Sequence, residues 1–166
     1  MQDFFDFPNP VNEVSARLVA AGVVVLCALT LLLDQPWLML PLAYGFVARV
    51  LTGPKLSPLG QLVTRIVTPN LPFAPKPVPG PPKRFAQGMG ATMSVAAVTL
   101  HFVLGAAGVA DVLVAMILFA ATLESAFAFC IGCKVFAVLM RLGVIPEDVC
   151  ADCNDIWARQ GAPAAS

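Results

Sequence analysis

Charged residues are scarce in this sequence of 166 residues, and their scarcity argues against several classes of protein. Asp, Glu, Lys and Arg make up 12% of the chain, whereas a soluble domain has roughly 25%. The formal net charge is zero, so no nucleic-acid partner is predicted. A basic segment is missing from the first residues, which are acidic and aromatic, and we therefore expect no cleavable secretory signal.

Long apolar segments take the place of the missing charge. Hydrophobic residues make up 58% of the chain and the mean hydropathy is +0.83. Several runs approach the roughly 20 residues that cross a bilayer. The alternative, a soluble helical bundle, would need polar helix faces that these runs lack. We therefore expect residues 1–166 to form one integral membrane domain in contact with the lipid bilayer.

The predicted fold is all-α, with four transmembrane helices at about residues 16–33, 37–51, 85–104 and 109–129. The second of these is short for a ~30 Å hydrocarbon core. The ten Lys and Arg residues lie on or next to the side that holds both termini and the central loop. The positive-inside rule makes that side cytoplasmic. The prediction is a multi-pass protein of the inner (plasma) membrane, with cytoplasmic N- and C-termini and a cytoplasmic tail over residues 130–166.

The central loop holds a predicted amphipathic helix. Ser57 is a suitable N-cap and Pro58 suits the first helical position. Apolar residues then recur at helical spacing, at Leu59, Leu62, Val63, Ile66 and Val67. Such a helix would lie in the cytoplasmic membrane interface, or would pack on another subunit of an oligomer. The proline-rich segment 69–82 that follows is expected to be an extended strap.

Small and ionisable residues mark positions within the predicted spans. Ala86, Gly90 and Ser94 form a ridge that would let another helix approach closely. Glu124 is costly in a span unless it is paired, and Arg49 or His101 is its expected partner. His101 itself is expected to be a hydrogen-bonded structural residue, and the lone Cys27 a small hydrophobic one.

Four of the five cysteines form two C-x-x-C pairs, Cys130 with Cys133 and Cys150 with Cys153. The first pair lies at the end of an apolar run, and a helix is predicted to start near Cys130. A helix N-terminus and the neighbouring Lys134 would both favour a thiolate. On a continuous helix, however, Glu124 would lie ~120° away from Cys130, which argues against its acting as a base for that thiol.

Two chemistries fit this pattern. A reactive dithiol needs one low-pKa thiol and a resolving neighbour. The spacing C-x2-C-x16-C-x2-C equally suits a structural zinc site made by Cys130, Cys133, Cys150 and Cys153, and suits an iron–sulfur centre less specifically. Spacing alone leaves both open.

Several strings in the chain resemble a bacterial, largely actinobacterial membrane-protein family, the domain of unknown function DUF4395. The strings are Asn9-Pro10-Val11-Asn12, Arg17-Leu18-Val19-Ala20, Gly53-Pro54-Lys55-Leu56-Ser57-Pro58, Pro82-Lys83-Arg84-Phe85-Ala86-Gln87-Gly88 and Phe129-Cys130-Ile131-Gly132-Cys133-Lys134. The resemblance implies an association with thioredoxin-like and sulfurtransferase-like proteins, and hence thiol or sulfur chemistry at Cys130 and Cys133.

The resulting hypothesis is a membrane thiol module for disulfide exchange or sulfur transfer at the cytoplasmic face. Cys130 would be the attacking thiolate, Cys133 the resolving thiol, and Cys150 with Cys153 a second pair that relays to a soluble thioredoxin-like or sulfurtransferase-like partner. The alternative is a non-catalytic scaffold or transport subunit whose four cysteines hold zinc. The first hypothesis requires no cofactor.

Overall fold

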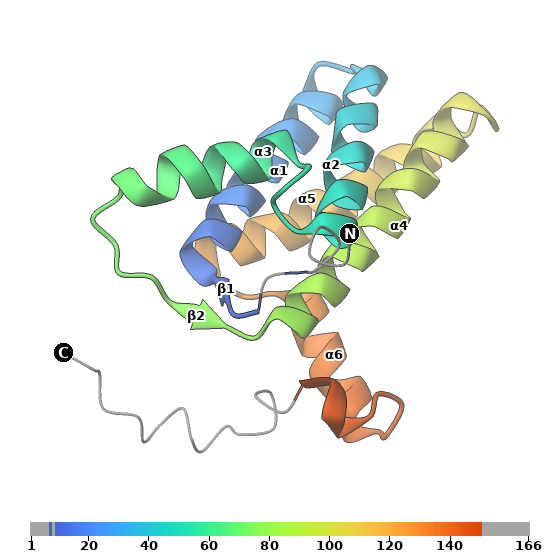
Figure 1. Cartoon of the computed structure of the whole chain (residues 1–166). Helices are drawn as coiled ribbons and strands as arrows, with labels where there is room; N and C mark the ends of the chain where they lie inside the picture. Colours follow the sequence, from blue (N-terminus) through green and yellow to red (C-terminus); the bar gives the residue numbers. More distant parts are fainter. Residues whose placement is uncertain (1–6, 8, 151–166) are drawn as a thin grey trace.

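The computed structural model describes residues 7 and 9–150 and is predominantly helical, which confirms the all-α prediction (Figure 1). Four longer helices are joined by short elements. The helices are α1 (Glu13–Leu32), α2 (Met39–Thr52), α3 (Pro58–Leu62), α4 (Gly80–Phe102), α5 (Ala107–Phe127) and α6 (Ile131–Arg141). The short elements are β1 (Val11–Asn12), η2 (Pro36–Leu38), η3 (Val63–Val67), η4 (Thr68–Asn70), β2 (Pro77–Val78) and η5 (Glu147–Cys150).

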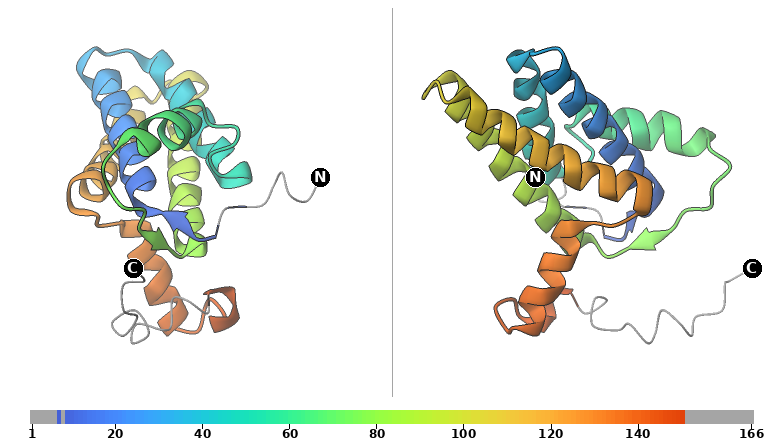
Figure 2. Two further views of the ribbon diagram at one scale, coloured as in Figure 1. Left: turned by 60° about the vertical axis from the view of Figure 1, so that its left-hand side comes forward. Right: turned by 180° about the vertical axis from the view of Figure 1, so that it is seen from behind.

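Two helical hairpins pack against each other, as the views in Figure 2 show. Helices α1 and α2 form one hairpin and α4 and α5 the other, with α1 on α5 and α2 on α4. The turns of both hairpins lie at the same end of the bundle, where the rings of Trp37 and Phe102 are 5.3 Å apart. Helix α6 leaves the bundle at the opposite end, which also holds the start of α1 and of α4.

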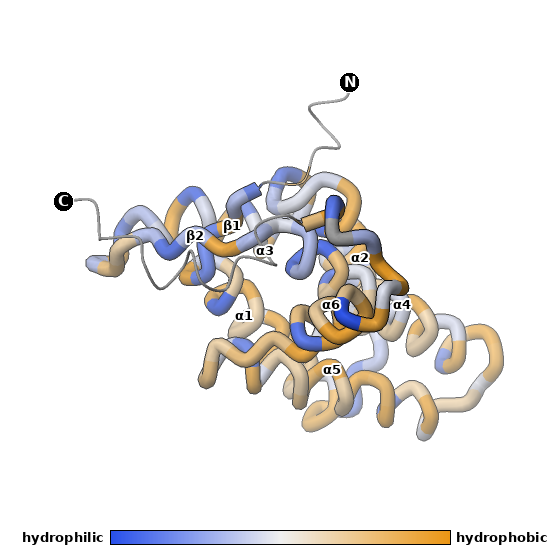
Figure 3. Tube along the Cα trace, turned by 90° about the horizontal axis from the view of Figure 1, so that it is seen from below, coloured by the Kyte–Doolittle hydropathy of each residue, from blue (hydrophilic) through white to orange (hydrophobic). Residues whose placement is uncertain are grey.

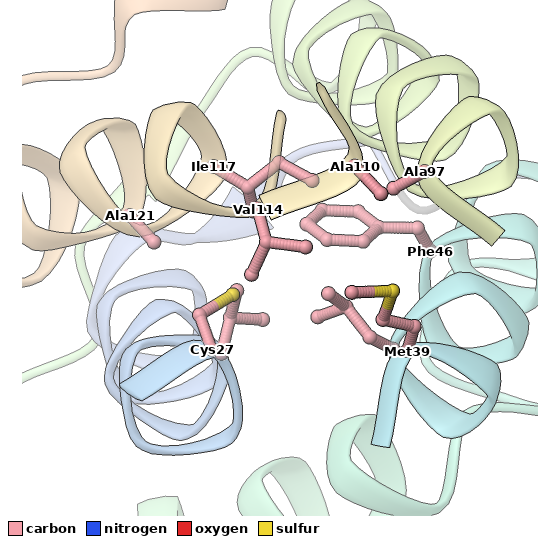
Figure 4. Close-up of a cluster of buried hydrophobic side chains, with 10 residues drawn as sticks. Cys27, Met39, Phe46, Ala97, Ala110, Val114, Ile117 and Ala121 are labelled. Atoms are coloured by element: carbon pink, nitrogen blue, oxygen red, sulfur yellow. The ribbon is translucent and has the colours of Figure 1, made fainter. Parts of the chain in front are cut away.

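The core lies where the two hairpins meet (Figure 4). Cys27 is fully buried in it, which confirms its prediction as a small hydrophobic residue. The predicted ridge of small residues is confirmed at Gly90, because a Cβ there would lie 2.3 Å from Cε1 of Phe46 on α2. Ser94, one turn further along α4, is 1% exposed. The small side chains therefore set how closely α2 and α4 approach.

Two helices, α1 and α5, are long and apolar enough to cross a membrane, with mean hydropathies of 2.2 and 1.9. The sequence predicted four. Helix α2 has 14 residues and is short for a ~30 Å core at 1.5 Å per residue, even when the preceding η2 extends the apolar segment to Pro36–Thr52. Helix α4 has 23 residues, but its charged and strongly polar residues, Lys83, Arg84, Gln87 and His101, lower its hydropathy. The tube in Figure 3 shows α5 as an almost continuous apolar stretch.

The predicted central helix begins as expected. Ser57 is its N-cap and accepts a hydrogen bond from Gly60 N at 3.2 Å. Helical turns then continue through η3 and η4 to Asn70. Val63 is buried, whereas Leu62 and Ile66 are 49% and 55% exposed. Only part of the predicted apolar face therefore packs against the bundle, and the rest of that face is exposed.

The proline-rich segment is shorter than predicted. It is extended only as far as Pro79, and its β2 residues pair antiparallel with β1, with Val11 opposite Val78. Pro81 and Pro82 belong to the first turn of α4. The prediction of a strap up to residue 82 was wrong because proline is well tolerated in the first turn of a helix, where its missing N–H would be unpaired.

Candidate functional site

The first C-x-x-C pair lies at the start of α6, as predicted. Helix α5 ends at Phe127, Ala128 adopts a left-handed conformation with φ of 54°, and Cys130 is extended, with φ of −89° and ψ of 107°. Cys130 is the N-cap of α6, and its Sγ accepts a hydrogen bond from Cys133 N at 3.4 Å. Cys130 thus occupies an N-cap position, where serine is common, and its sulfur takes the place of the serine oxygen. This sulfur lies at the N-terminal end of the helix, which favours negative charge.

The two thiols are electrostatically unequal. The pKa of Cys130 is lowered, mainly because the Cys133 thiol donates a hydrogen bond to its sulfur; Lys83 assists, while burial and Glu124 oppose the effect. The pKa of Cys133 is raised, because its proton is held in that hydrogen bond and because the thiol is buried. Both shifts favour ionisation of the Cys130 sulfur over that of Cys133.

Behind the thiols lies a buried ion pair. Lys83 Nζ and Glu124 Oε1 are 2.5 Å apart, and their side chains are 9% and 15% exposed. The prediction that Arg49 or His101 would pair with Glu124 was wrong, because Lys83 forms the ion pair and Arg49 interacts with the carboxylate only from beyond ion-pair distance. Helix α4 begins at Gly80, so Lys83 lies in its first turn and faces α5, where the sequence had suggested the end of a loop. The signal that could have found this is Pro81-Pro82, which suits a helix start.

Glu124 and Cys130 line the same cavity, which has a volume of about 90 Å³. Gln87 of α4 contributes a further polar group, and the rest of the lining is largely apolar. The predicted separation of ~120° between Glu124 and Cys130 assumed a continuous helix. The helix breaks at Ala128, and the turn brings the thiol back towards the carboxylate.

Arg17 stabilises the break between α5 and α6. Its Nε and Nη2 donate to Ser125 O at 3.1 and 3.0 Å, and Nη2 also donates to Ala126 O at 3.2 Å. A cation at a helix C-terminus satisfies carbonyl groups that lack partners within the helix. The start of α1 therefore holds the end of α5, from which the thiol segment leaves.

His101 lies at the end of α4, away from the thiols. Its Nδ1 is buried and has no hydrogen-bond partner among the described residues, and its ring lies 4.9 Å from that of Phe102. The prediction that it is hydrogen-bonded was therefore wrong at this nitrogen. The contact that the structure shows for this ring is its packing on Phe102 at the end of the bundle.

The second C-x-x-C pair is only partly described. Cys150 is 4% exposed, packs with Phe136 and Met140, and is disulfide-bonded. It thus lies beside the later turns of α6, whereas Cys130 precedes the first. Cys153 lies outside the described residues. Among residues 7 and 9–150, no three or more His, Cys, Asp or Glu side chains are grouped to hold a metal ion.

Comparison with known proteins places the chain in a family. No curated protein and no solved structure matches it. The model of the family described as Domain of unknown function (DUF4395) matches residues 11–141. That range begins at β1 and ends with α6, so it contains the whole bundle, the Lys83–Glu124 ion pair and the Cys130–Cys133 pair. The protein belongs to this family, DUF4395.

Proposed function

We propose that the chain is a multi-pass protein of the inner membrane in which α1, α2, α4 and α5 all lie in the bilayer, with both termini cytoplasmic. The apolar character of α1 and α5 supports this, as does the packing of α2 and α4 into the same bundle. Large apolar side chains on the outer surface of α5 are more than half exposed, among them Val109, Val112, Met116 and Phe119. A soluble protein rarely exposes so much contiguous apolar surface.

The function that the site supports best is thiol–disulfide exchange or sulfur transfer by Cys130 and Cys133. One observation carries the proposal: Cys130 Sγ receives hydrogen bonds from the backbone N–H and the thiol of Cys133. Both bonds stabilise a thiolate. Lys83 supplies a positive charge nearby, which Glu124 partly offsets.

In the exchange reaction, the Cys130 thiolate attacks one sulfur of a partner's disulfide. A mixed disulfide forms and the other partner sulfur leaves as a thiolate, which takes up a proton. Cys133 then loses its proton and attacks Cys130 Sγ, which closes the Cys130–Cys133 disulfide and releases the second partner sulfur as a thiol. Two electrons and two protons pass to the partner, which is reduced as the dithiol is oxidised.

The partner of this reaction would be a soluble thioredoxin-like or sulfurtransferase-like protein that reaches the cytoplasmic face. In sulfur transfer, the Cys130 thiolate would instead attack the outer sulfur of a partner's persulfide, form its own persulfide, and release the partner's thiolate. Cys150 and Cys153 would act as a second pair.

The test is to trap the mixed disulfide. In the full chain, Cys133→Ser should accumulate a covalent adduct with an oxidised thioredoxin-like protein, because the resolving thiol is gone. Cys130→Ser should form none, and Cys27→Ser, which changes a core cysteine, should behave as the wild type. Equal trapping by Cys130→Ser and Cys133→Ser would contradict the assigned roles.

Metal analysis of the same protein tests the alternative, a structural zinc scaffold, which the spacing of the four cysteines favours. One zinc per chain, with no thiol that reacts under native conditions, would support the scaffold and contradict thiol exchange. Reversible oxidation of the first pair in metal-free protein would support exchange.

A further inference from the structure

A second cavity, of about 190 Å³, lies between the start of α1, the end of α2, the central helix and the start of α4. Two cationic side chains line it, Arg49 and Lys83, together with the polar Asn12, Ser15 and Gln87. No Asp or Glu is among the described residues that line it. This cavity is separate from the one that Cys130 lines, although Gln87 contributes to both.

Arg49 is the more unusual of the two cations. It is 6% exposed, and no carboxylate lies within ion-pair distance of it among residues 7 and 9–150. Its Nε donates to Gln87 Oε1 at 2.9 Å and its Nη1 to Ser57 Oγ at 3.3 Å. Both acceptors are neutral. The Glu124 carboxylate interacts with Arg49 only from beyond ion-pair distance, because its ion pair is with Lys83.

The charges around the cavity do not balance. Lys83 is paired with Glu124, which leaves Arg49 as an additional buried cation. Desolvating a charge is costly unless an opposite charge approaches it. The hydrogen bonds to Gln87 and Ser57 come from Nε and Nη1 of Arg49, and guanidinium donors suit the paired oxygens of an oxyanion.

We propose that this cavity binds a phosphate-type oxyanion, held by the guanidinium of Arg49 and the ammonium of Lys83. The anion would place a negative charge in direct contact with the Arg49 guanidinium, and Asn12 and Ser15 could donate further hydrogen bonds. The same chemistry is carried by a free inorganic anion and by the headgroup of an anionic phospholipid. The proposal does not depend on the thiol reaction: Lys83 contributes to both sites, but anion binding requires no cysteine.

The test uses the full chain in detergent, with inorganic phosphate as the free probe and chloride at equal ionic strength as the reference. Phosphate should raise the unfolding temperature saturably. Arg49→Gln, which keeps an amide near Gln87 and Ser57, should weaken phosphate binding by at least about tenfold. Arg65→Gln is the matched control, because it removes an exposed cation of the neighbouring η3 and should leave binding unchanged.

A second variant tests the proposal independently, in case Arg49→Gln does not fold. Ala16→Met keeps both cations and fills the cavity, which Ala16 lines, so it should also lose the phosphate effect. Nanodiscs of phosphatidylcholine with and without phosphatidylglycerol test the lipid source. Stabilisation by phosphatidylglycerol but not by phosphate would assign the site to a headgroup, and the reverse to a free anion. The proposal is overturned if neither probe stabilises the wild type, or if both variants keep the effect.

Discussion

Lys83 Nζ lies 2.5 Å from Glu124 Oε1, and this ion pair joins the first turn of α4 to the last turn of α5, 41 residues further along the chain. Both residues interact electrostatically with Cys130 and Cys133. The pair therefore fixes two helices at the point where the thiol segment leaves the bundle.

Removing one partner of this ion pair should destabilise the fold. Lys83→Met leaves the Glu124 carboxylate buried without a counter-charge, which typically costs about 3 kcal/mol or more. The double variant Lys83→Met, Glu124→Leu should recover much of that loss, since it leaves no buried charge. Thermal unfolding of both variants in detergent measures the difference.

A surface ion pair provides the control. Lys76 Nζ lies 2.8 Å from Glu13 Oε2, but the Lys76 side chain is 72% exposed. Lys76→Met should cost less than about 1 kcal/mol, because water screens an exposed pair. An equal loss in Lys76→Met and Lys83→Met would contradict the importance assigned to burial.

The reactivity of Cys130 should depend on Cys133. The hydrogen bond from the Cys133 thiol lowers the pKa of Cys130, so the reactive thiolate forms at a lower pH in the wild type. Cys133→Ala removes that donor, and the rise of alkylation rate with pH should move to higher pH. Site-resolved mass spectrometry of alkylated protein across a pH series provides the measurement.

Cys27→Ala is the matched control for this profile, because it removes a thiol from the core and leaves the pair intact. Its pH profile should overlay that of the wild type. A Cys133→Ala profile that also overlays the wild type would show that another group sets the reactivity of Cys130.

The close contact between α2 and α4 can be tested with two glycines of one helix. A Cβ at Gly90 would lie 2.3 Å from the ring of Phe46, whereas a Cβ at Gly88 meets nothing within 4 Å. Gly90→Ala should destabilise the bundle by about 1–3 kcal/mol. Gly88→Ala should be neutral or stabilising by up to about 1 kcal/mol, because alanine favours a helix. Similar unfolding temperatures for the two variants would contradict the tight approach.

The proposed topology predicts which residues a membrane-impermeant maleimide can reach in intact cells. Leu33→Cys and Leu104→Cys, in the turns of the two hairpins, should react from outside when the native cysteines are replaced by alanine. Leu142→Cys, after α6, should react only once the membrane is opened. Labelling of Leu142→Cys in intact cells would contradict the proposed orientation. Failure of the maleimide to label either turn in intact cells would contradict four spans.

Local features of the sequence were sufficient to predict much of the fold. The helix start at Cys130 and the Ser57 cap were correct because capping joins groups only three residues apart. The predicted start of α4 was too late in the chain, because a run of prolines is compatible both with an extended strap and with the first turn of a helix. That displacement hid Lys83, which sequence analysis had left in a loop.

The sequence by itself determined the order of the helices and the position of the first thiol pair at a helix start, because these depend on composition and on contacts within a few residues. Only the tertiary structure decided that Lys83 pairs with Glu124, and that buried Arg49 has no carboxylate within ion-pair distance in the part of the chain that the structure describes. It also decided that Glu124 shares a cavity with Cys130. These outcomes depend on how helices far apart in the chain pack, and on the left-handed turn at Ala128 that redirects the chain between α5 and α6.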